Sequence, residues 1–132
     1  NYAHLLKLSK EEAIWFFDNE NPREISEKLL TCPDVIITDG SEPISWFING
    51  LYGITKVNNS SKIIDTTGAG DAFLAGFISK LISSGYPLKD LEIQNYIKFA
   101  SVCGLLTCLG EGAIEQQPNY ASVNKFLGSQ IL

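Results

Sequence analysis

Hydrophobic and polar positions follow two different periods along the chain, which predicts strands interleaved with helices. Residues 35–38 (VIIT) are all β-branched and mostly apolar, a pattern typical of a strand covered on both faces in a parallel sheet. Residues 44–48 and 51–57 flank Asn49 and Gly50, the strongest short signal for a β-hairpin. We therefore expect a buried strand, the polar turn 39–43 and then an antiparallel hairpin.

Two short helices are expected before the buried strand. Ser9 and Glu12 have the spacing of a capping box, in which each side chain satisfies a free backbone N–H at a helix start. This helix should run to Phe17, after a short apolar segment at residues 4–8. Pro22 suits the first turn of a second helix, where its missing N–H has no effect. The expected buried stripe of that helix is Ile25, Leu29 and Leu30.

The second half of the chain predicts longer helices. Helical runs cover residues 72–84 and 91–108, and residues 120–127 predict a terminal helix. Gly85 and Pro87 end the first run in the usual order, with glycine just past the helix and proline behind it. Strands and helices that alternate in this way indicate an α/β domain with helices layered on a sheet.

Composition indicates one globular domain. Of the 132 residues, 45% are hydrophobic and 19% charged, which suffices for a core. No apolar run reaches the roughly 18 to 20 residues of a membrane-spanning helix, so we expect a cytoplasmic protein without a membrane partner. The net charge of −5, without a cluster of basic residues, argues against nucleic acid. A nucleotide is still compatible with this charge as a ligand, because backbone N–H groups can hold its phosphates.

Cysteine and histidine residues are few in this chain. The cysteines Cys32, Cys103 and Cys108 form no C-x-x-C pair and are expected to be reduced thiols in the core. His4 is the only histidine, so neither a histidine-dependent triad nor a multi-histidine metal site is expected. The chain contains no methionine, even at position 1, and we interpret it as part of a longer protein.

The segment with the most chemical information is residues 65–71 (DTTGAGD), where an extended segment should turn into a helix. Gly68 and Gly70 let the backbone approach a ligand, and the unpaired N–H groups of the first helical turn attract an anion. Asp71 would lie beside this anion hole and could accept a proton from an attacking hydroxyl, as phosphoryl transfer requires. The local pattern fits equally well a purely structural role, in which Gly68 and Gly70 only make a turn and Asp71 only caps the helix. The segment matches neither a P-loop nor a dinucleotide fingerprint.

The whole segment DTTGAGDAFLAGF (65–77) resembles the C-terminal signature of the ribokinase-like, or pfkB-type, carbohydrate kinases. KLSKEE (7–12) resembles the N-x-x-E region of that family, and VIITDGSEP (35–43) its T-x-G nucleotide strand and turn. ASVCGLLTCLGEGAIEQQP (100–118) resembles its adenine and cation segment. The resemblance implies a three-layer α/β/α fold. It also implies that residues 1–132 are the C-terminal nucleotide-binding and catalytic part, without the N-terminal sugar-binding and lid part.

The resemblance also implies roles for individual residues. Asp71 corresponds to the catalytic base, and the N–H groups of Gly68, Ala69 and Gly70 to the anion hole for the transferred phosphoryl group. The positions implied for the nucleotide are Thr38, Gly40, Ser41, Ser9 and Ser101. Those implied for a monovalent cation, K⁺ or another, are Asp65, Thr67, Thr107, Gly110 and Gly112. Glu12 matches the acidic residue that influences Mg²⁺ and phosphate.

Four positions depart from the family pattern. Ser9 stands in place of the usual asparagine of N-x-x-E, so residues 9–12 fit that site and a simple capping box equally well. Asp39 replaces an apolar residue beside the nucleotide turn, and Pro43 replaces a frequent glycine. Gln116 lies where a serine can contribute to the cation site. The contacts to ATP and to the cation are therefore expected to differ from the usual ones.

The activity implied by the resemblance is ATP-dependent phosphorylation of a sugar hydroxyl. Fructose is favoured because KLSKEE and GAIEQQP resemble fructokinases more than ribokinases; ribose and nucleosides stay open. The alternative is a non-catalytic relative that serves as a binding or regulatory module, whereas a dehydrogenase would need a Rossmann fingerprint that is absent. The expected partners are ATP with Mg²⁺ and a sugar, and a homodimer of the full-length protein is left open. Without the sugar-binding part, this chain alone is expected to be inactive.

Overall fold

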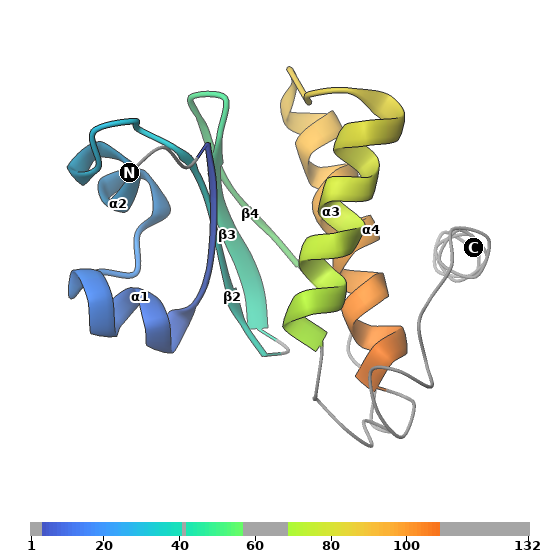
Figure 1. Cartoon of the computed structure of the whole chain (residues 1–132), viewed down its shortest axis with the longest axis horizontal. Helices are drawn as coiled ribbons and strands as arrows, with labels where there is room; N and C mark the ends of the chain where they lie inside the picture. The colour runs from blue at the N-terminus through green and yellow to red at the C-terminus, as the bar shows by residue number, and fades with distance from the viewer. Residues whose placement is uncertain (1–3, 41, 57–68, 109–132) are drawn as a thin grey trace. The chain divides into compact units, whose positions relative to one another are not determined.

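The computed structural model describes residues 4–40, 42–56 and 69–108, with the side chains of residues 69, 107 and 108 outside the description (Figure 1). It divides into two compact units, one containing Asn1–Lys56 and Leu88–Ile93 and the other Val57–Pro87 and Gln94–Leu132. The elements in chain order are β1 (Leu5–Ser9), α1 (Lys10–Phe17), α2 (Pro22–Lys28), β2 (Asp34–Asp39), β3 (Glu42–Ile48), β4 (Leu51–Thr55), α3 (Ala69–Ser84) and α4 (Asp90–Cys108). The helix expected at 120–127 lies outside the described residues.

The first unit contains a four-stranded mixed sheet in the order β1-β2-β3-β4. β1 and β2 are parallel, and α1 and α2 form the crossover that a parallel pair requires. β3 is antiparallel to both β2 and β4. The predicted buried strand and hairpin are thus confirmed, and the segment expected at 4–8 is a strand of the sheet.

Two tight turns join the last three strands. Asn49 and Gly50 have φ angles of 52° and 75°, and positive values at both positions are those of the predicted hairpin turn. Gly40, with φ 56°, begins the turn between β2 and β3. The polar turn predicted over five residues is therefore wrong in length: Asp39 and Glu42 belong to the strands and pair with each other.

One face of the sheet packs against α1 and α2 (Figure 1). The core of this layer contains Leu8, Ala13, Ile25, Val35 and Ile37, with Leu6, Phe17 and Leu29 packed against it. The prediction for Leu30 is wrong, because α2 ends at Lys28 and the Leu30 side chain is 87% exposed. Successive side chains of a strand point to opposite faces of the sheet. The face opposite this core therefore carries four further buried residues, namely Ile36, Ile44, Trp46 and Ile48.

In the second unit α3 and α4 pack closely. A Cβ atom added to Gly76 on α3 would approach the Cys103 Sγ atom on α4 to 2.7 Å, so glycine permits this contact. The rings of Phe77 and Tyr96 meet edge to face, with centroids 6.1 Å apart. Gly85 ends α3 with φ 84°, as predicted, and its carbonyl accepts a hydrogen bond from the Tyr96 hydroxyl at 2.8 Å. None of the described helices has the length and hydrophobicity of a membrane crossing.

The prediction of buried thiols is correct for Cys103 and wrong for Cys32. Cys103 is buried on α4, whereas Cys32 is exposed in the connection between α2 and β2. Cys32 has a φ angle of 44°, a left-handed conformation typical of turns. Cys32 is exposed in spite of its apolar side chain, because it lies in a turn of the chain. The side chain of Cys108 lies outside the described residues.

Candidate active site

The carboxyl ends of β1 and β2 bring together several residues that the sequence singled out. Ser9 is the register partner of Thr38 at the ends of these two parallel strands. Gly40 follows the last residue of β2 and is exposed, while Ser41 lies outside the described residues. In open α/β sheets, ligands bind beyond the carboxyl ends of parallel strands. Three of the five residues expected at the nucleotide, Ser9, Thr38 and Gly40, thus share the edge of the sheet where a ligand is expected.

The capping box predicted at the start of α1 is present. The Ser9 backbone N–H donates to Glu12 Oε1 at 2.8 Å, and the Glu12 backbone N–H donates to Ser9 Oγ at 3.1 Å. The hydrogen bond from the Ser9 backbone is the main cause that holds the pKa of the Glu12 carboxyl below its ordinary value of 4.5. Glu12 is therefore ionised at neutral pH and exposed. Its structural role is established, and a role toward Mg²⁺ stays a prediction.

Lys10 is a charged residue of this region that the sequence interpretation missed. Its Nζ atom lies 3.8 Å from Asp39 Oδ2 and 3.9 Å from Glu20 Oε2. A cation in the first turn of a helix lies at the end that the helix dipole makes positive. That unfavourable placement was the signal in the sequence that could have directed attention to Lys10.

The start of α3 carries the proposed catalytic residues of the second unit. α3 begins at Ala69, three residues before the predicted start, so Ala69, Gly70 and Asp71 all belong to its first turn. The backbone N–H groups of a first turn have no intrahelical partners. Gly70 and Asp71 are exposed, so this helix end can reach a solute. Gly68 lies outside the described residues.

The remaining predicted residues are only partly described. Ser101 is half-buried on α4, and its Oγ donates to the Lys98 carbonyl at 2.8 Å. Thr107 belongs to the last turn of α4, where carbonyl groups lack intrahelical partners. The other cation positions, Asp65, Thr67, Gly110 and Gly112, lie outside the described residues. Among the residues that are described, no cluster of three or more His, Cys, Asp and Glu side chains could hold a metal ion.

Comparison with known proteins identifies the family. Residues 1–119 match the family described as pfkB family carbohydrate kinase. A probable chloroplastic fructokinase-6 of Arabidopsis thaliana is 32% identical in an alignment of length 131 that covers 95% of this chain and 34% of that protein. A probable fructokinase-7 of the same plant is 30% identical over 98% of this chain and 39% of its own length. The chain thus spans between a third and two fifths of the length of these relatives.

Solved structures show the same fold. The fructokinase of Xylella fastidiosa with bound ATP superimposes with a TM-score of 0.87 at 20% identity, covering 98% of this chain and 44% of that one. The fructokinase of Vibrio cholerae O395 with fructose, ADP and calcium ion bound has a TM-score of 0.79 at 28% identity, covering 95% and 41%. The α/β fold is therefore ribokinase-like, as expected, and the chain belongs to the pfkB family of carbohydrate kinases.

Proposed function

We propose that the protein containing this chain transfers the terminal phosphoryl group of ATP to a sugar hydroxyl, with fructose as the favoured acceptor. The observation that carries this proposal is the position of Asp71, an exposed carboxylate in the first turn of α3. Membership of the pfkB family supports it. The fructokinase relatives, and the fructose bound in the similar structure from Vibrio cholerae, favour fructose over other sugars.

The chemistry follows from the residues at this helix end. The Asp71 carboxylate accepts the proton of the sugar hydroxyl while the hydroxyl oxygen forms a bond to the terminal phosphorus of ATP. The bond between that phosphorus and the oxygen bridging it to ADP breaks, and ADP leaves. The first-turn N–H groups of Ala69 and Gly70, together with the N–H group of the preceding Gly68 in the sequence, are the proposed donors that stabilise the negative charge of the transferred group.

The proposed reaction also uses two cations, Mg²⁺ and a monovalent ion, whose candidate ligands are chemically suited to them. Mg²⁺ prefers carboxylate and phosphate oxygens, so the ionised Glu12 suits a place near Mg²⁺ bound to ATP, where the metal would neutralise phosphate charge. Carbonyl groups at the end of α4, near Thr107, are of the kind that K⁺ binds. We propose the same ion ligands that the family resemblance implies, with Asp65, Thr67, Gly110 and Gly112 completing the monovalent site.

The sugar-binding part is proposed to lie outside this chain. The chain covers only between a third and two fifths of the relatives that it matches, so it carries the nucleotide and base positions while other residues of the natural protein would hold the sugar. Activity should therefore be measured on the natural full-length protein, by ADP release with ATP and a panel of sugars. Sugar-stimulated ADP release is the expected result, and its absence would favour a non-catalytic binding module.

The role of Asp71 is tested by Asp71→Asn. Without a carboxylate to accept the proton, turnover should fall by about a hundredfold or more, while ATP binding stays close to that of the wild type. Asp18→Asn is the matched control, because Asp18 caps the far end of α1 in a left-handed conformation with φ 50° that asparagine adopts readily. Unchanged turnover in Asp71→Asn would show that another group is the base.

A further inference from the structure

Lys10 and Asp39 occupy the same edge of the sheet, each next to a residue of the nucleotide region. Ser9 and Thr38 are register partners at the ends of β1 and β2, and Lys10 and Asp39 are the residues that follow them. The Lys10 Nζ atom lies 3.8 Å from Asp39 Oδ2. The ion pair therefore joins the first turn of α1 to the last residue of β2.

Lys10 attracts the carboxylates of Asp39 and Glu20 by charge alone, without a hydrogen bond to either. The distances of 3.8 and 3.9 Å exceed hydrogen-bond range, and the side chains of Lys10, Asp39 and Glu20 are 43%, 44% and 62% exposed. Such a pair adds little to stability. Its main effect is on the electrostatic potential at the end of the sheet, where Glu11, Glu12 and Glu42 add further negative charge.

Asp39 creates an electrostatic difficulty for the proposed substrate. It precedes Gly40 at the turn expected to border ATP, a position where the family resemblance implies an apolar residue. A carboxylate repels a polyphosphate that approaches within a Debye length, and the helix dipole of α1 offsets only part of this repulsion. A cation held beside Asp39 lessens this repulsion, in addition to the neutralisation that Mg²⁺ bound to ATP would supply.

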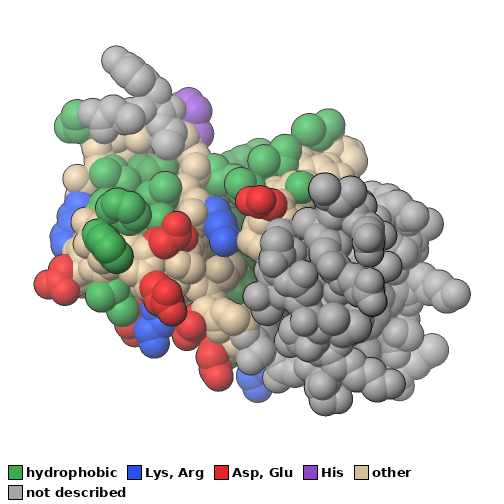
Figure 2. Space-filling model, turned by 60° about the horizontal axis from the view of Figure 1, so that its bottom comes forward, with side chains coloured by type: hydrophobic (Ala, Val, Ile, Leu, Met, Phe, Trp, Pro, Cys, Tyr) green, Lys and Arg blue, Asp and Glu red, His purple; other side chains and the backbone are tan. Residues whose placement is uncertain are grey.

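We infer that Lys10 is a positioning residue for the nucleotide, which acts by cancelling the charge of Asp39 rather than by contact with a phosphate. The inference rests on the proposed function as an ATP-dependent kinase. It assigns the pair to nucleotide affinity and leaves the chemical step to the residues of α3. Basic and acidic side chains are interspersed on the face shown in Figure 2.

The test is a double-mutant cycle in the natural full-length protein. Lys10→Gln should weaken ATP binding and raise the KM for ATP by about threefold to tenfold at low ionic strength, with kcat unchanged. The defect should shrink at high salt, because the interaction is screened. Asp39→Asn alone should bind ATP at least as tightly as the wild type. In the double variant Lys10→Gln with Asp39→Asn, affinity should return to within about twofold of the wild type, because the repelling charge is gone. Lys10→Arg should behave like the wild type.

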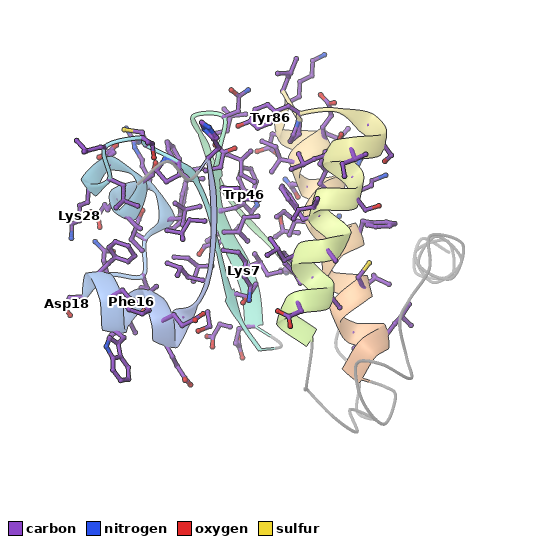
Figure 3. The ribbon with its side chains drawn as sticks, in the orientation of Figure 1. Lys7, Phe16, Asp18, Lys28, Trp46 and Tyr86 are labelled. Carbon is purple, nitrogen blue, oxygen red and sulfur yellow. The ribbon has the colours of Figure 1, made fainter. Side chains whose placement is uncertain are left out.

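Lys28→Gln is the matched control for the loss of one positive charge. Lys28 is exposed in the last turn of α2 and points away from the sheet (Figure 3). Its removal should leave ATP affinity unchanged. Thermal unfolding of every variant checks that the effects on affinity do not arise from loss of the fold.

Two results would overturn the inference. A defect in Lys10→Gln that persists in the double variant would mean that Lys10 contacts the phosphates directly, and an ATP affinity unaffected by Lys10→Gln would mean that the pair has no role toward the nucleotide. ATP binding is measured by equilibrium titration without sugar, so it does not depend on turnover. A wild-type protein that binds ATP and shows the expected cycle, but lacks sugar-stimulated ADP release, would contradict the proposed function alone.

Discussion

Trp46 lies directly across from Gly53, and its indole ring occupies the space where a side chain at position 53 would begin. The two residues are register partners on β3 and β4, and a Cβ atom at position 53 would overlap the ring. The Nε1 atom of Trp46 donates to Thr55 Oγ1 at 2.9 Å. Glycine inside this strand is therefore explained by an aromatic neighbour that covers it.

Gly53→Ala should destabilise the protein, although alanine usually suits a strand better than glycine. The added methyl group displaces the buried Trp46 ring, at an expected cost of about 1–3 kcal/mol in the free energy of unfolding. Urea denaturation measures the change. In a Trp46→Phe background the smaller ring should relieve much of the overlap, so an equal penalty in both backgrounds would contradict this explanation.

Thr55→Val should be destabilising because it removes the acceptor for the indole N–H. Trp46 and Thr55 are 0% and 1% exposed, so water cannot easily replace the lost partner, and the expected penalty is about 1–3 kcal/mol. Thr55→Ser keeps the hydroxyl and is the matched control, with a smaller loss from the missing methyl group. If valine and serine gave the same unfolding free energy, the hydrogen bond would have no net effect on stability.

The capping box of α1 predicts a dependence of stability on pH. Because the pKa of Glu12 is lowered in the folded state from 4.5, its contribution is fully present above pH 4.5 and disappears as the pH falls through the lower folded-state value. Glu12→Gln should reduce the unfolding free energy at pH 7 by about 0.3–1 kcal/mol. The difference from the wild type should vanish in acid.

Urea denaturation of the wild type and Glu12→Gln across this pH range measures the effect. Glu11→Gln is the control, since Glu11 lies in the same helical turn outside the capping box. A difference between the wild type and Glu12→Gln that stayed constant from pH 7 to strongly acidic pH would rule out Glu12 ionisation as its source.

The two described cysteines should differ in reactivity. Burial raises the pKa of the Cys103 thiol from 9.0 to about 11, so its thiolate fraction near pH 8 is about a hundredfold lower than that of an ordinary cysteine. Iodoacetamide labelling followed by peptide mass spectrometry should find Cys32 modified long before Cys103. In urea the two rates should converge, and early modification of Cys103 in the folded protein would be inconsistent with its burial.

The sequence by itself determined the elements whose formation depends on neighbouring residues. Asn49 and Gly50 adopt positive φ angles and so form the predicted hairpin turn, and Ser9 with Glu12 closes the predicted capping box. Gly85 ends α3 for the same kind of local reason. The signature at residues 65–77 indicated the family before any comparison, and the base, anion-hole and cation assignments drawn from it stay predictions.

Only the tertiary structure decided the relationships between residues distant in sequence. The proximity of Lys10 to Asp39 depends on the register in which β1 and β2 pair. The position of Gly53 beneath Trp46 depends on the register in which β3 and β4 pair. Local patterns encode backbone angles and burial periods, but a register results from many packing and hydrogen-bond contacts formed together. For the same reason hydrophobicity alone could not separate the exposed Leu30 and Cys32 from the buried Ile25 and Cys103.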